Sequence, residues 1–116
     1  MVNTYAKGNR VEKLARKLFE DRGWITWKPS RAKFNSNDAF GLFDFIAVKE
    51  TKVIFAQVKS QASHFYSSRK EIAKWLEDHK LLTYCLCILY EGNNEWRKEW
   101  YDVIEHKWEK YNLTNE

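Results

Sequence analysis

The sequence has few of the residues that mark linkers, cross-links or membrane spans. Its 116 residues include one proline, four glycines and two cysteines. No proline-rich or glycine-rich tract and no repeat divides the chain, so we expect a single domain over residues 1–116. No apolar run of about 18 residues occurs, and the first ten residues lack the apolar core of a signal peptide. These absences favour an intracellular protein with no membrane segment.

The two cysteines are too few for a disulfide framework or a structural metal site. Cys85 and Cys87 lie two residues apart in "TYCLCILY", on one face of an expected strand. A zinc site would need a second pair of ligands, and no histidine is near them in sequence. We interpret both as small apolar core residues, with a redox pair as the alternative. An apolar fraction of 44% can build a core without such cross-links.

Acidic residues are scarce at the start of the chain. The first 33 residues hold nine basic and three acidic side chains, which gives this segment a net charge of +6. The whole chain has a net charge of +4, so the remainder carries −2. A basic segment of this kind suggests a polyanionic partner such as nucleic acid. The alternative is a solvated basic helix face with no partner.

Hydrophobic periodicity predicts two helices and at least four strands. The expected helices span residues 9–22 and 67–80, and the expected strands span residues 24–28, 41–48, 52–60 and 83–90. A capping box formed by Ser68 and Glu71 should begin the second helix. Residues 29–40 are typical of a long polar loop, and residues 95–111 fit either a strand or a helix. The order of elements predicts an α/β fold, with a mixed central β-sheet flanked by helices.

Three polar residues interrupt two apolar strands that should form a hairpin. They are Asp44 in "GLFDFIAV" and Gln57 and Lys59 in "KVIFAQVKS". If Glu50 and Thr51 form the tip, the numbers of paired residues add up to 101. Asp44 then lies opposite Gln57, with Lys59 as its diagonal neighbour, unless a bulge shifts the pairing by one residue. The hairpin therefore predicts that the three side chains converge.

This convergence has a structural and a functional interpretation. The structural one is a buried Asp44–Lys59 ion pair bridged by the amide, which is rarely a net stabilising arrangement. The functional one is a metal site, because carboxylate and amide oxygens are hard ligands that suit Mg²⁺. Glu12 lies at the edge of the apolar stripe of the first helix, where it either joins this site or is solvated.

The order of these motifs resembles the PD-(D/E)xK nuclease superfamily, and within it the archaeal-type Holliday junction resolvases. The resemblance is carried by "KGNRVEKLARKLFEDRGW", "GLFDFIAV" and "FAQVKS", and covers about residues 5–90. Gln57 stands where an acidic residue is usual. The resemblance implies a restriction-endonuclease-like core and a metal-dependent, structure-selective endonuclease. Such an enzyme would cut four-way DNA junctions by phosphodiester hydrolysis.

The resemblance also implies roles for particular residues. The catalytic positions would be Glu12, Ser30, Asp44, Gln57 and Lys59. The ligands of Mg²⁺, for which Mn²⁺ would substitute, would be Glu12, Asp44, Gln57 and Val58. The residues expected to bind DNA are Lys7, Arg10, Arg31, Lys33 and Arg69. Symmetric junction cleavage needs two active sites and therefore implies a C2 homodimer. Its surface would come from the aromatic residues after position 95 or from the strand around Cys85.

Other functions fit the same motifs. The chain could be a different nuclease of this superfamily, such as a nickase or a flap or repair endonuclease. It could also be a catalytically inactive DNA-binding module that keeps the fold, a hypothesis that Gln57 favours. An RNA-binding basic face is a weaker alternative.

Overall fold

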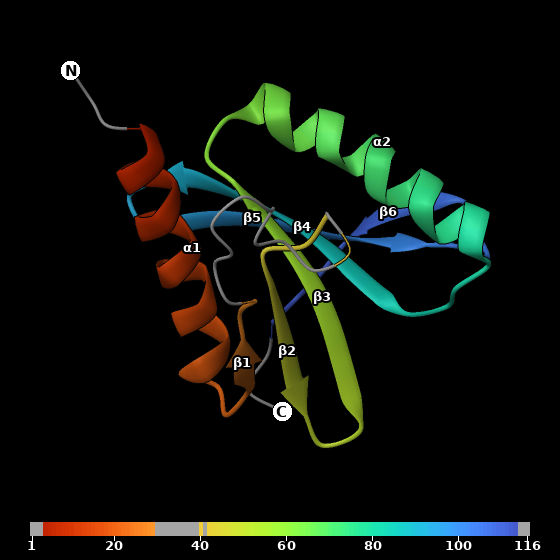
Figure 1. The fold of residues 1–116 in the computed structure, drawn as a ribbon, viewed down its shortest axis with the longest axis horizontal. Coiled ribbons are helices and arrows are strands. Elements are labelled where there is room, and N and C mark those ends of the chain that lie inside the picture. The colour runs from red at the N-terminus through yellow and green to blue at the C-terminus, as the bar shows by residue number, and fades with distance from the viewer. Residues whose placement is uncertain (1–3, 30–39, 41, 114–116) are drawn as a thin grey trace.

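A computed structural model describes residues 4–29, 40 and 42–113. Its elements are α1 (Thr4–Glu20), β1 (Ile25–Trp27), β2 (Phe45–Lys49), β3 (Lys52–Lys59), α2 (Ala62–His79), β4 (Tyr84–Gly92), β5 (Glu95–Asp102) and β6 (Lys107–Lys110). The strands form one sheet in the order β1-β2-β3-β4-β5-β6 (Figure 1). β3 and β4 are parallel, and every other neighbouring pair is antiparallel. The predicted α/β fold with a mixed central sheet flanked by helices is thus confirmed.

Each face of the sheet has its own core. On one face α1 contributes Ala15 and Phe19, which pack with residues of β2, β3 and β4. On the other face α2 contributes Phe65, Ile72 and Leu76. Because β3 and β4 lie between the two helix layers, both strands are mostly apolar on both faces, as parallel strands usually are.

Helix α1 forms because its apolar residues recur at helical spacing. Val11, Ala15 and Phe19 are buried at intervals of four residues. The helix begins at Thr4, five residues earlier than expected, and ends at Glu20. Gly23 follows with a φ of +87°, a conformation that favours glycine after a helix end.

Helix α2 begins earlier than the sequence suggested. It starts at Ala62, and its N-cap residue Gln61 makes no side-chain capping hydrogen bond. The expected capping box of Ser68 and Glu71 is therefore wrong, because Ser68 is a buried residue inside the helix. Phe65 explains the difference, since it extends the buried helix face by one turn beyond the serines.

Both cysteines lie in the core between α2 and the sheet, as predicted. Cys85 and Cys87 are fully buried on β4, and the Cys87 thiol donates to the backbone oxygen of Phe65 at 3.6 Å. Burial raises the pKa of each thiol to about 12. At neutral pH they are protonated and act as small apolar side chains.

The β2–β3 hairpin has the predicted register over most of its length. Its pairs run from Lys49–Lys52 to Phe45–Ala56, so their numbers do add up to 101. The pairing changes at Asp44, which lies just before β2. The Asp44 N–H donates to the Ala56 oxygen at 2.8 Å, so two consecutive residues face Ala56, as in a β-bulge. The backbone of Asp44 is thus shifted by one residue from the expected place opposite Gln57.

The uncertain C-terminal segment forms two strands, β5 and β6. Trp96 and Trp100 pack against the α1-side core, and Tyr101 and Trp108 belong to the α2-side core. These aromatic residues cover the core of the monomer. The strand β4 is an interior strand whose residues 85–89 are buried, so it offers no surface to a twin. Within the described ranges, neither helix is long and apolar enough to cross a membrane.

Candidate functional site

Asp44 is oriented by the strand next to it. Its Oδ2 accepts a hydrogen bond from the Val58 N–H of β3 at 2.7 Å. The bulge turns residue 44 toward β3, and its carboxylate takes a backbone donor that would otherwise pair with a strand carbonyl. A charge-assisted bond of this length fixes the direction of a half-buried carboxylate.

Gln57 is the most unusual polar residue of the cluster. Its side chain is only 7% exposed, and its Oε1 has no hydrogen-bond partner within the described part of the chain. Burying an unpaired amide oxygen costs about 1–3 kcal/mol. By register Gln57 pairs with Cys87 of β4, so both side chains stand on the α2 face of the sheet. The structure thus directs an unsatisfied hard oxygen toward the same region as the Asp44 carboxylate.

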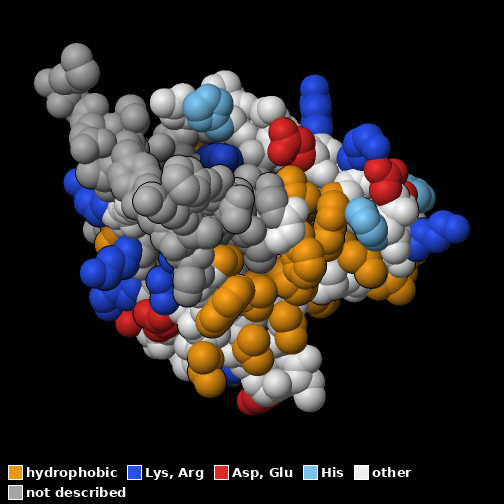
Figure 2. All heavy atoms as spheres, viewed as in Figure 1, with side chains coloured by type: hydrophobic (Ala, Val, Ile, Leu, Met, Phe, Trp, Pro, Cys, Tyr) orange, Lys and Arg blue, Asp and Glu red, His pale blue; other side chains and the backbone are white. Residues whose placement is uncertain are grey.

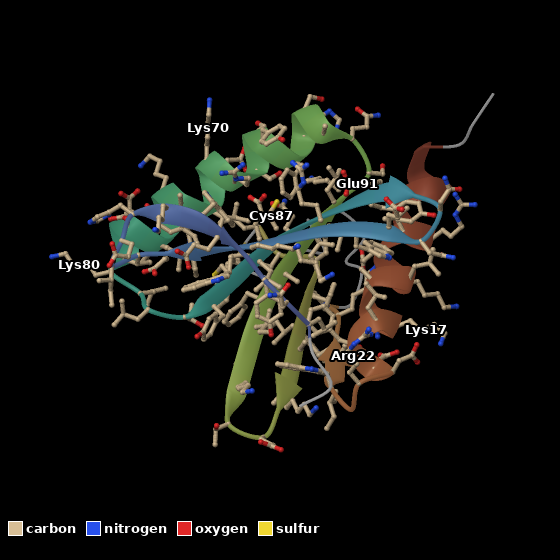
Figure 3. The ribbon with its side chains drawn as sticks, turned by 180° about the vertical axis from the view of Figure 1, so that it is seen from behind. Lys17, Arg22, Lys70, Lys80, Cys87 and Glu91 are labelled. Atoms are coloured by element: carbon tan, nitrogen blue, oxygen red, sulfur yellow. The ribbon has the colours of Figure 1, made fainter. Side chains whose placement is uncertain are left out.

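Lys59 stands two residues further along the same face of β3. It is half-buried and pairs by register with Leu89. Cys87, which Figure 3 labels, lies beside this spot, and the charges that act on its thiol show what surrounds it. Burial chiefly raises the pKa of Cys87, Lys59 and Arg69 oppose that rise, and the carboxylates of Glu99 and Asp44 add to it. Asp44, Gln57 and Lys59 are therefore brought into one neighbourhood.

Glu12 makes its closest described contact elsewhere. Its Oε1 lies 2.7 Å from the Lys28 ammonium, and both side chains are mostly buried. Glu12 belongs to α1, whose buried residues pack on the opposite face of the sheet from Gln57. Among the residues that the structure describes, no group of three or more His, Cys, Asp or Glu side chains is placed to hold a metal ion. A ligand role for Glu12 stays a prediction.

The residues expected to bind DNA lie in different parts of the structure, and some lie outside the described residues. Arg10 is exposed on α1, beside a shallow hollow that Lys13 and Lys17 also line. Ser30, Arg31 and Lys33 lie outside the described residues, as does the side chain of Lys7.

Arg69 is partly buried and is held by contacts with other side chains. Its Nε lies 3.4 Å from Glu99 Oε1, and its guanidinium carbon lies 5.3 Å from the ring centre of Trp108 and 5.4 Å from that of Tyr66. These contacts tie α2 to β5 and β6. They give Arg69 a structural task, and its expected DNA contact stays a prediction.

Sequence reasoning missed Arg97. Lys59 pairs with Leu89, and Leu89 pairs with Arg97, so the Arg97 side chain shares the face of Lys59 two strands away. Its Nη1 donates to the Tyr66 hydroxyl of α2 at 2.8 Å. The alternation in "EWRKEWYD" was the available signal, because Trp96 and Trp100 face one core whereas Tyr101 faces the other.

None of the protein-family models matches the chain. No curated protein matches it either. Among solved structures, the chain is similar to Hjc, a Holliday junction resolvase from the archaeal hyperthermophile Archaeoglobus fulgidus, with a TM-score of 0.46 and 13% identity. That match covers 91% of this chain and 88% of the other. The chemistry of the site therefore has to be read from the residues of this chain.

Proposed function

We propose that the chain is a metal-dependent endonuclease that cuts branched DNA, and specifically a Holliday junction resolvase. The observation that carries this proposal is the buried, unpaired Oε1 of Gln57 in the neighbourhood of the Asp44 carboxylate and Lys59. A buried polar atom without a protein partner is usually satisfied by an ordered water, an ion or a ligand. Two hard oxygens with an ammonium nearby suit a divalent cation and a phosphodiester.

Asp44 and Gln57 would hold Mg²⁺, and Mn²⁺ would substitute for it. Glu12 and Val58 are further predicted ligands. When bound, the ion would lower the pKa of a water molecule and stabilise negative charge on the phosphoryl oxygens. Because Gln57 adds no charge, the negative charge of this set would come from Asp44 and, as the second carboxylate, Glu12.

The side chains of the chain have distinct tasks in this proposal. The Val58 N–H holds the Asp44 carboxylate in one orientation. Lys59 orients the attacking water and adds positive charge where negative charge develops on the phosphate. Arg97 stands two strands away, roughly 10 Å in the plane of the sheet, and offers its guanidinium to a neighbouring phosphate.

Selectivity for DNA structure fits these contacts. Contacts to phosphates fix the position of a protein on DNA without reading its sequence. Arg10 on α1 and the basic segment that precedes β2 would add such contacts, and Lys7, Arg31, Lys33 and Arg69 are the other predicted ones. Two symmetric cuts across a junction require two sites, so the enzyme would act as a C2 homodimer.

Cleavage assays on matched substrates test the proposal. The protein is incubated with Mg²⁺ and a labelled four-way junction, a flap or a linear duplex of the same sequence. We expect cutting of the junction, and loss of cutting in Asp44→Asn with junction binding retained. Asp78→Asn is the control, because Asp78 is an exposed acid that pairs with Lys74 on α2 at 2.6 Å. A fully active Asp44→Asn would refute the site, and equal rates on linear duplex would favour another nuclease of the superfamily.

A catalytically inactive DNA-binding module is the second candidate function. Two observations favour it: Gln57 replaces an acid, and Glu12 is paired with Lys28. If the wild type binds junctions but cuts none of the three substrates with Mg²⁺ or Mn²⁺, this candidate replaces the resolvase.

A further inference from the structure

A lysine is half-buried on the α1 face of β5 without an acidic partner. Trp96 and Trp100 belong to the α1-side core, so Lys98, which lies between them in β5, stands on the same face by alternation. Its ammonium forms no ion pair with a carboxylate in the part of the chain that the structure describes. Burying a charge without a partner is costly, because the charge loses hydration. Packing alone therefore does not explain why a lysine stands here.

Two further cations act on Lys98. Burial chiefly lowers the pKa of Lys98, and the charges of Arg22 and Lys110 lower it further. Arg22, which Figure 3 labels, lies in the turn after α1. Its Nη1 donates to the Leu18 oxygen at 2.9 Å, but its buried Nε has no acceptor among the described residues. Because like charges repel one another, this grouping favours an anion that neutralises all of them.

Lys98 and Lys110 line one hollow beside β5. The hollow has a volume of about 700 Å³, and the half-buried rings of Trp96 and Tyr111 also line it. We call this hollow, together with Arg22 beside it, the basic recess. Its volume lies in the range of small-molecule sites, about 300–1,000 Å³. The basic recess thus offers cations and flat apolar rings to the same ligand.

The acidic side chains of the basic recess are engaged by arginines. Glu99 Oε1 lies 3.4 Å from Arg69 Nε, and Glu91 Oε2 lies 4.0 Å from Arg97 Nη2. Neither acid is among the groups that shift the pKa of Lys98. The two acids therefore leave the charge of the recess uncompensated.

The basic side chains of α1 are arranged differently. Arg10, Lys13 and Lys17 are exposed along the helix, and Figure 2 shows Lys and Arg side chains spread over that side of the molecule. Cations that are spread in this way suit the DNA backbone, in which each phosphate carries one negative charge. Cations that converge on one ammonium instead suit a single group with more than one charge. A phosphate monoester carries about −1.5 to −2 at neutral pH, and a diphosphate carries more.

We propose that the basic recess is a second ligand site, which binds a nucleoside diphosphate. Lys98, Lys110 and Arg22 hold the diphosphate by charge-assisted contacts. The ring of Trp96 or Tyr111 stacks on the base, an interaction that every nucleobase can make. Lys98 stands on the opposite face of the sheet from the candidate nuclease site. The inference therefore does not rest on the proposed nuclease activity.

Calorimetric titration with defined ligands tests the proposal. ADP, adenosine, inorganic pyrophosphate and the dinucleoside phosphodiester ApA are each titrated into the full chain in EDTA, which keeps divalent cations away from the candidate metal site. We expect ADP to bind with a Kd of about 1–100 µM, and at least about ten times more tightly than adenosine or ApA. Pyrophosphate should bind more weakly than ADP, because it has no base to stack.

Three lysine variants locate the binding. Lys98→Met and Lys110→Met each remove an ammonium and keep an unbranched side chain. Lys107→Met is the control, because Lys107 lies on the same strand as Lys110, pairs with Glu109 at 3.3 Å and does not line the recess. Each of the first two variants should weaken ADP binding by about tenfold or more, the loss expected for a charge-assisted contact. The control should change it by less than about twofold.

Three results would overturn the inference. The first is the absence of ADP binding at about 1 mM. The second is ApA binding as tightly as ADP, which would make the recess a contact for a nucleic-acid backbone. The third is an equal loss of ADP binding in Lys110→Met and Lys107→Met, two exposed positions at which the variants should fold normally. Pyrophosphate binding as tightly as ADP would overturn the role of the rings and with it the nucleoside.

Discussion

Replacing Gln57 by methionine tests the chemical argument for the site. Methionine is unbranched and nearly as long as glutamine, so it fills the same space without the amide. Gln57 is 7% exposed and its Oε1 has no described partner. Removing an unpaired buried oxygen should recover part of the about 1–3 kcal/mol that its desolvation costs. In EDTA we therefore expect Gln57→Met to raise the free energy of unfolding by about 1–2 kcal/mol.

Urea unfolding with and without Mg²⁺ measures this effect. For a urea m-value of about 2 kcal/mol/M, the midpoint in EDTA should rise by about 0.5–1 M. Mg²⁺ should cancel most of this difference, because a ligand at about ten times its Kd stabilises the wild type by about 1.4 kcal/mol and leaves Gln57→Met unchanged. The same variant should cut no DNA. Gln61→Met is the control, since Gln61 is exposed and makes no capping bond. It should shift stability by less than about 0.5 kcal/mol.

One result would refute the reasoning about Gln57. If Gln57→Met is less stable than the wild type in EDTA, the amide makes favourable hydrogen bonds in the folded protein. The Gln57 oxygen then already has hydrogen-bond partners, and the argument that it binds a divalent cation fails. Stabilisation in EDTA without any Mg²⁺ effect on the wild type would support the inactive DNA-binding module.

Three further predictions follow from other contacts. Burial raises the pKa of Cys85 and Cys87 from 9.0 to about 12, so above pH 9 the folded chain keeps protons that the unfolded chain loses. Stability should fall there by up to about 1.4 kcal/mol per thiol per pH unit, and urea titrations of the double alanine variant should lack that part of the slope. Glu12→Gln should slow junction cleavage more than about tenfold in single-turnover assays, whereas Lys28→Met should not. If both variants lose the same rate in proportion to their loss of Tm, the Glu12–Lys28 ion pair serves stability only. Hydrogen bonds, first from His106, lower the pKa of Glu77, so its contribution to stability is present above pH 4.5 and disappears at lower pH. An NMR titration midpoint at or above 4.5 would contradict this.

Local sequence patterns predicted that Asp44, Gln57 and Lys59 of the candidate site lie together. The other features of the candidate site depend on contacts between segments that are distant in sequence. Asp44, Gln57 and Lys59 lie on a short hairpin, whose two-residue turn fixes the register from sequence alone. The bulge at Asp44 has no such signature, because it depends on how the carboxylate meets the Val58 N–H. The position of Arg97 requires two non-local pairings, one parallel and one antiparallel, that no local spacing encodes.

The start of α2 and the exposed apolar side chains of β1 and β2 were missed for a similar reason. Propensity suggested that the serines cap the helix, but burial of Phe65 against Cys87 extends the helix past them. Alternating apolar residues in β1 and β2 looked like ordinary strand interiors. Which of their faces stays open depends on where α2 lies across the sheet, and that is a tertiary property.

Near its start the strand β3 exposes the apolar side chain of Val53, and near its end it carries the candidate site. Val53, Phe55, Gln57 and Lys59 alternate on one face, so that face changes from exposed and apolar to buried and polar over six residues. Val53 and Gln57 are four residues apart, which is roughly 13 Å along a strand. Gln57 and Lys59 are therefore held in place by the geometry of one strand.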